Sequence, residues 1–153
     1  MNETWRNSVK TLVKETFGGP PSEGGMFTEA RPNSGLFGTL DKLTANEASV
    51  SVNGATVAAH ADHTRFYLWG TNAILKDGKQ PDMNWEESWK ISSVDDEGWH
   101  RIREELRHEY ATLLESLDEL EWNEPLTKEV LGSLAHSAYH LGAIRQMLKA
   151  IKM

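Results

Sequence analysis

The chain has 153 residues, no cysteine, and a formal net charge of −7 from 16 basic and 23 acidic side chains. This length fits one domain, residues 1–153, with a hydrophobic core of its own. The lack of cysteine excludes disulfides, cysteine-based zinc sites and a thiol nucleophile supplied by the chain. The negative charge, without a stripe of Lys and Arg, argues against nucleic acid as a partner.

The sequence gives no sign of a membrane association. Residues 1–6 lack the apolar segment of a signal peptide, and no stretch approaches the roughly 18 consecutive apolar residues of a membrane span. We therefore expect a cytoplasmic protein that has no membrane partner.

The first helix is predicted from about Glu3 to Phe17, where apolar residues recur at helical spacing. The run GGPP at residues 18–21 predicts its end. The following segment, residues 18–43, is rich in Gly, Pro and Ser but carries apolar residues, so we expect an ordered loop with a short helical turn. Loops of this length are often functional, although a strap that covers the bundle is the favoured interpretation.

Three more helices follow in the sequence. The second is predicted from near Asn53 to about Lys76, the third from about Asp95, and the fourth from just after the segment 123–125 to the C-terminus. Asp95 suits the N-cap of the third helix, because its side chain can accept a hydrogen bond from the first turn. The pattern predicts an all-α fold: an antiparallel up-down four-helix bundle with a long ordered loop after the first helix.

The polar connection between the second and third predicted helices, residues 78–95, contains Trp85 and Trp89. Two aromatic side chains in a polar segment must pack on something. They either form an apolar lid over the bundle or a platform on which a substrate stacks, and the lid is the favoured interpretation.

The histidines form a pattern of their own. His136 and His140 lie four residues apart in the fourth predicted helix, so their imidazoles share one face and can hold a metal ion together. His60 and His63 both fall on the inward face of the second helix and are the candidates for a third ligand. His100 lies off the apolar stripe of the third helix.

His108 lies off the same stripe, so both of these histidines are expected to face solvent. Asp62 falls on the polar side of the second helix and is expected to be a solvated carboxylate.

On the fourth helix, Ala135, Ala138 and Gly142 form a face of small residues. This face predicts close approach of another backbone, either a neighbouring helix or a second subunit in a homodimer.

Two motifs together resemble the DinB/YfiT-like superfamily of metal-binding four-helix bundles. The first is TVAAHADH at residues 56–63, and the second is HSAYHLGAIRQ at residues 136–146. The segment 43–48 and the Trp-rich segment 82–89 extend the similarity over most of the chain beyond Leu36. The fold alone does not fix a reaction, because one fold carries many chemistries.

The resemblance implies a divalent metal, zinc or nickel, held by His60, His136 and His140. Three protein ligands leave at least one coordination position open, which is the arrangement of a catalytic site. His63 shares the face of His60 and is an alternative ligand, an outer-shell partner or an acid/base group; an outer-shell or surface role is favoured over ligation.

By this resemblance we expect a metal-dependent enzyme with a small-molecule substrate, a transferase that uses a low-molecular-weight thiol in S-transfer or detoxification. A metal-dependent hydrolase and a non-catalytic, stress-related binding protein are the alternatives. Asp62, Tyr67, Glu109 and Tyr139 are candidate accessory groups. No general base and no catalytic residue is assigned from the sequence.

Overall fold

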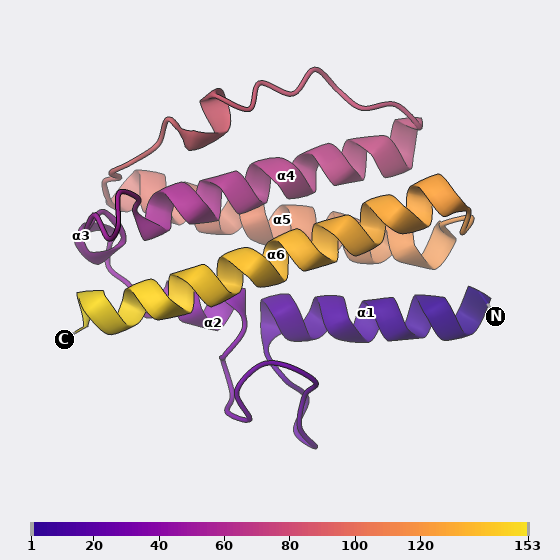
Figure 1. Ribbon diagram of the computed structural model, residues 1–153, viewed down its shortest axis with the longest axis horizontal. Helices are drawn as coiled ribbons and strands as arrows, with labels where there is room; N and C mark the ends of the chain where they lie inside the picture. Colours follow the sequence, from indigo (N-terminus) through magenta and orange to yellow (C-terminus); the bar gives the residue numbers. More distant parts are fainter. Residues whose placement is uncertain (1, 153) are drawn as a thin grey trace.

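A computed structural model describes residues 2–152 of the chain, which fold into four long helices packed together (Figure 1). The all-α prediction is confirmed, as is the non-helical stretch after the first helix. Among the described residues, no helix is long and apolar enough to cross a membrane. The long helices are α1 (Asn2–Gly18), α4 (Val57–Asp77), α5 (Asp96–Glu119) and α6 (Glu124–Ile151). Between them lie the short helices α2 (Leu36–Asp41) and α3 (Ala45–Ala48) and the 3-10 turn η1 (Glu87–Trp89).

Side-chain caps explain where the last three long helices begin. Thr56, Asp95 and Asn123 each precede a helix, and each side chain accepts a hydrogen bond, 2.7 to 3.0 Å long, from the backbone N–H three residues later. Gly78 ends α4 in the left-handed conformation, with its N–H donated to the carbonyl of Ile74. These caps fix both ends of α4, the helix that carries two of the histidines.

Helix α4 begins four residues later than the sequence predicted. Asn53 and Gly54 have φ angles of 53° and 86°, which belong to the left-handed region and cannot continue a right-handed helix. The chain turns there and enters α4 only at Val57, after the Thr56 cap.

The directions of the helices differ from a strict up-down order. Figure 1 shows α4 and α5 running the same way, with α1 and α6 running opposite to both. Ion pairs and hydrogen bonds agree, because Arg65 pairs with Glu105 and Asn72 with Glu109, so residue numbers rise together along the two helices. The prediction of an up-down order was therefore wrong for α5. The physical reason is the connection 78–95, which returns along α4 and packs η1 against it.

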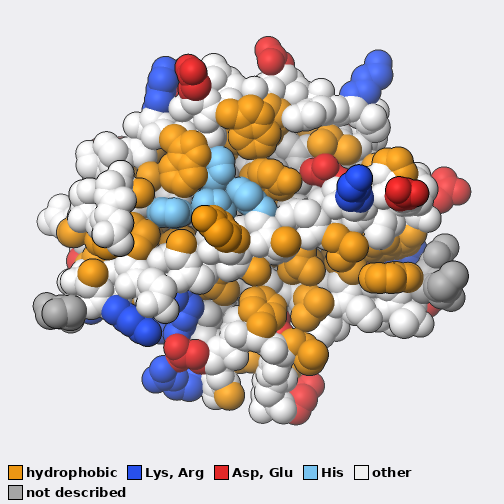
Figure 2. All heavy atoms as spheres, viewed as in Figure 1, with side chains coloured by type: hydrophobic (Ala, Val, Ile, Leu, Met, Phe, Trp, Pro, Cys, Tyr) orange, Lys and Arg blue, Asp and Glu red, His pale blue; other side chains and the backbone are white. Residues whose placement is uncertain are grey.

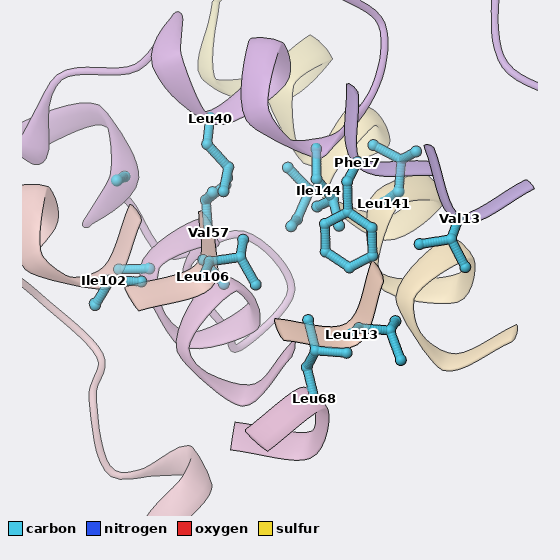
Figure 3. Packing of buried hydrophobic residues seen from close by; sticks show 14 of the residues in the cluster. Val13, Phe17, Leu40, Val57, Leu68, Ile102, Leu106, Leu113, Leu141 and Ile144 are labelled. Atoms are coloured by element: carbon cyan, nitrogen blue, oxygen red, sulfur yellow. The ribbon is translucent and has the colours of Figure 1, made fainter. Parts of the chain in front are cut away.

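The hydrophobic core lies between the four long helices. Figure 3 shows side chains from α1, α2, α4, α5 and α6 converging on it. The apolar stripe predicted for the third helix is buried from Trp99 to Leu120, with Tyr110 packed partly buried against the core. Trp99 also donates its Nε1–H to the carbonyl of Leu43, so the segment before α3 is attached to α5.

The small-residue face of α6 is only partly covered by the rest of the chain, with Ala138 half-buried. Ala135 and Gly142 are exposed, and a Cβ added at Gly142 would meet no atom within 4 Å. Tyr139 projects between them with 73% of its surface exposed. The homodimer stays a prediction, now with a face that the chain leaves open.

A buried carboxylate anchors the loop that follows α1. Glu15 is 1% exposed, and its two oxygens accept hydrogen bonds from the backbone N–H groups of Met26, Phe27 and Thr28 and from the Thr28 hydroxyl. Burial raises the pKa of the Glu15 carboxyl, but these four hydrogen bonds outweigh burial and leave the pKa below its ordinary value. Glu15 therefore orders this loop.

We expect Glu15→Gln to lower the free energy of unfolding by about 2 kcal/mol, because an amide cannot accept all of these hydrogen bonds and leaves a backbone N–H of the loop without its acceptor. Urea unfolding at neutral pH measures the change. Glu23→Gln is the matched control, since Glu23 is exposed in the same loop. Equal stability of the two variants would show that the carboxylate does not anchor the loop.

Candidate metal centre

Four histidines meet where α4 packs against α6. His60 and His63 come from α4, and His136 and His140 from α6. The two helices run antiparallel, so the first turns of α4 lie beside the middle of α6. Ring nitrogens of His63, His136 and His140 all lie within 4.8 Å of one another, which is the spacing of groups that can hold one metal ion.

The hydrogen bonds of His63 determine which of its nitrogens is free. The Ser88 hydroxyl donates its one proton to the carbonyl of Trp85, at 2.6 Å. Its oxygen therefore accepts from His63, and the Nδ1 of His63, 2.9 Å away, carries the proton. A neutral imidazole has one protonated nitrogen, so Nε2 of His63 has a lone pair available for a metal.

The other three histidines form a chain of close nitrogens. Nδ1 of His60 lies 2.9 Å from Nδ1 of His140, and Nε2 of His140 lies 3.2 Å from Nε2 of His136. Each contact needs one protonated and one bare nitrogen. The chain ends at His136 Nδ1, which is buried without a hydrogen-bond partner among the described residues. The cluster thus keeps one buried ring nitrogen without a partner among the described residues.

Aromatic side chains hold two of the rings in place. Trp89 stacks on His63 with ring centroids 4.2 Å apart and planes 19° apart, and Tyr67 stacks on His136 at 3.9 Å and 17°. Trp85 lies against Tyr67 and His63 at longer range. Stacked rings lose rotational freedom on folding, so the imidazoles are oriented before any ligand arrives.

The environment keeps the histidines neutral. Burial lowers the pKa of His136 to about 4, with a smaller contribution from His63. Burial lowers the pKa of His140 to about 3, assisted by the neighbouring His136, His60 and His63. The pKa values of His60 and His63 are lowered as well, again chiefly by burial. Neutral imidazole is the form that a metal ion requires, so the rings are in that form at neutral pH.

The cluster is accessible from one side of the protein. Figure 2 shows the histidine side chains near the centre of one face, bordered by hydrophobic side chains. A pocket of about 460 Å³ adjoins His60 and is lined by the turn at Val52 and by α6 around Met147. Trp85 and Trp89 are 44% and 43% exposed, so they border the cluster without sealing it.

The structure brings together two of the three ligands expected from the sequence and places a different residue beside them. His136 and His140 share the cluster with His63, while His60 contacts His140 from the side. The assignment of His60 as a ligand stays a prediction. Ser88 is hydrogen-bonded to His63 and Trp89 stacks on it. Both lie in the connection between α4 and α5, whose course could not be predicted from the sequence.

The candidate accessory groups divide between the site and other places. Tyr67 lies at the site, and Tyr139 contacts the edge of His140 from the surface. Glu109 instead accepts a hydrogen bond from Asn72 on α4. The expectation that Asp62 is a solvated carboxylate was wrong.

Asp62 is only 6% exposed because its Oδ1 accepts a 2.9 Å hydrogen bond from Nε of Arg65, which neutralises its charge. The two histidines expected to face solvent, His100 and His108, are exposed as predicted.

Comparison with known proteins does not assign this chain to a family. No protein-family model, no curated protein and no solved structure matches the chain. The protein is therefore an all-α protein with a buried cluster of three histidines that could hold a metal ion.

We expect the metal-free protein to lose stability as the pH falls from about 6.5 toward 4. The pKa values of His136 and His140 in the folded protein, about 4 and about 3, lie below the value of 6.5 for a free histidine. The unfolded chain therefore binds more protons in this range, and acid favours unfolding. Urea unfolding with a chelator present, at several pH values, measures the slope.

His140→Gln serves as the control for that slope, because it removes the ring whose pKa is most depressed. Its stability should fall less steeply over the same pH range than that of the unchanged protein. Parallel slopes would mean that the buried imidazoles are not what couples stability to pH.

Proposed function

We propose that the protein is a divalent-metal-dependent enzyme of the DinB/YfiT-like type, with zinc or nickel held by His63, His136 and His140. The observation that carries this proposal is the set of three imidazoles, from two helices, whose ring nitrogens lie within 4.8 Å of one another. Three nitrogen ligands with an open position are typical of catalytic zinc sites. The ligand set differs from that expected from the sequence in one residue, His63 in place of His60.

The hydrogen bonds favour this assignment. His63 has its Nδ1 proton engaged by Ser88, which leaves Nε2 for the metal. Nε2 of His136 and of His140 face each other, and a cation would replace the proton that they share. His140 then keeps its Nδ1 proton and donates it to Nδ1 of His60, which becomes an outer partner that orients the ligating ring.

The side chains around the cluster have separate roles in this proposal. Ser88 and His60 fix the tautomers of His63 and His140, and the stacked rings of Trp89 and Tyr67 hold the imidazole planes. Burial together with Glu129 raises the pKa of Tyr67, so its hydroxyl remains a proton donor at neutral pH. When bound, the metal supplies Lewis acidity, which lowers the pKa of a thiol or water and polarises a carbonyl.

The neighbouring pocket supports a small-molecule substrate. Among the described residues that line it, His60 is the only ionisable one, and Asn53 and Gln146 are the polar ones. The chain has no cysteine, so no thiol of its own competes for the metal. These features fit an S-transferase or detoxification enzyme in which an external low-molecular-weight thiol is activated.

Metal analysis of alanine variants tests the ligand set. We expect His63→Ala, His136→Ala and His140→Ala to lose bound zinc almost completely. His60→Ala should keep it with roughly 10–100-fold weaker affinity, because an outer partner is lost. Elemental analysis after dialysis measures the metal per chain, and exposed His108→Ala is the matched control.

Two other outcomes have definite meanings. If His60→Ala loses the metal and His63→Ala keeps it, the ligands are His60, His136 and His140, as the sequence predicted, and the proposed assignment is wrong. If the unchanged protein binds no divalent metal in excess at neutral pH, the metal site and the enzyme are both rejected, and a binding protein becomes the better account.

The open coordination position has a test of its own. Cobalt(II) reports its ligands through its visible spectrum, and we expect the cobalt-loaded protein to gain a sulfur-to-metal charge-transfer band when a small thiol such as 2-mercaptoethanol is added. A spectrum that does not respond to any small ligand would indicate a closed, structural site.

A further inference from the structure

A second concave site lies away from the histidines, between the C-terminal halves of α4 and α5. It is a cleft of about 780 Å³ whose walls include Trp69 and Asn72 from α4 and Glu109 from α5. Pro81 and Leu126 close it at the end where both helices stop. None of the four histidines of the cluster lines it, so its ligand would be independent of the metal.

Asn72, which lines this cleft, has an unsatisfied acceptor. The residue is 6% exposed, and its Nδ2 donates to the carbonyl and to Oε2 of Glu109, at 2.9 and 3.0 Å. Both partners are acceptors, so the nitrogen must face them and the amide cannot be reversed. Its Oδ1 is then left buried with no hydrogen-bond partner among the described residues, which favours a ligand with an N–H or O–H donor.

The charges around the cleft favour a cation. The lining residues include four carboxylates and a single lysine: Asp77, Glu109, Glu119 and Glu121, with Lys76. Because α4 and α5 are parallel, both helices end here, and helix C-termini carry partial negative charge. The last turn of α5 contains no basic residue to offset that charge.

The remaining lining combines apolar and aromatic residues with the polar side chains of His108, Thr112 and Ser116. Trp69 is 37% exposed and stands on the same helix as Asn72. An indole face attracts organic cations and packs against flat apolar groups. A fully hydrated inorganic ion would gain no binding free energy from contact with the Trp69 indole.

We propose that the cleft binds an organic cation, a primary ammonium carried on an aromatic or aliphatic group. The ammonium donates a hydrogen bond to Oδ1 of Asn72 and pairs with the carboxylate of Glu109. The apolar group lies against Trp69. The site is separate from the histidine cluster and does not depend on the proposed metal.

Titration calorimetry with a set of matched probes tests the chemistry. We expect 2-phenylethylammonium to bind saturably at one site per chain, and neutral 2-phenylethanol and anionic 3-phenylpropionate to bind at least about tenfold more weakly. Trimethyl-(2-phenylethyl)ammonium keeps the charge but has no N–H, so it should also bind more weakly. Equal binding of the ammonium and the alcohol, or no binding of the ammonium, overturns the proposal.

A pair of variants tests the location. Glu109→Gln keeps an acceptor for Asn72 but removes the charge, so affinity for 2-phenylethylammonium should fall about tenfold or more. Glu115→Gln removes the same charge from an exposed position of the same helix and should leave the affinity unchanged. Unchanged affinity in Glu109→Gln, or an equal loss in both variants, would mean that the cation is not held in this cleft.

Discussion

The packing of α4 against α6 is the contact on which the chemistry of this protein depends. It brings four imidazole rings together, with His63 and His140 buried and His60 and His136 half-buried, and burial keeps His136 and His140 neutral, with pKa values of about 4 and 3. Rings that must stay neutral gain little from one another, because Nε2 of His140 and Nε2 of His136 have only one proton to share. A cation shared by their lone pairs would satisfy them, so the packing that forms the bundle also prepares the ligands.

The parallel course of α4 and α5 has consequences at both ends of the bundle. The connection 78–95 has to return along α4, and in doing so it places Ser88 and Trp89 on His63. A short turn between the two helices would have left that histidine without its hydrogen-bond partner. The same topology puts the C-termini of both helices at one end, where the acidic cleft around Asn72 lies.

Local signals in the sequence were sufficient for the helices but not for their arrangement or for the full site. The Asp95 cap and the spacing of His136 and His140 are short-range features, and each was confirmed where it was predicted. The direction of α5 depends on a polar connection with no periodicity. The part played by His63 depends on Ser88, which is 25 residues away in the chain, so helical spacing could not separate it from His60.

The central claim is that one metal ion sits among His63, His136 and His140. A crystal structure of the zinc-loaded protein, with diffraction data on either side of the zinc absorption edge, tests it directly. The account predicts one anomalous peak per chain, about 2.0–2.1 Å from Nε2 of each of the three histidines, with His60 hydrogen-bonded to His140 and not bound to the metal. A peak at surface carboxylates alone, or no peak at the cluster, would contradict it.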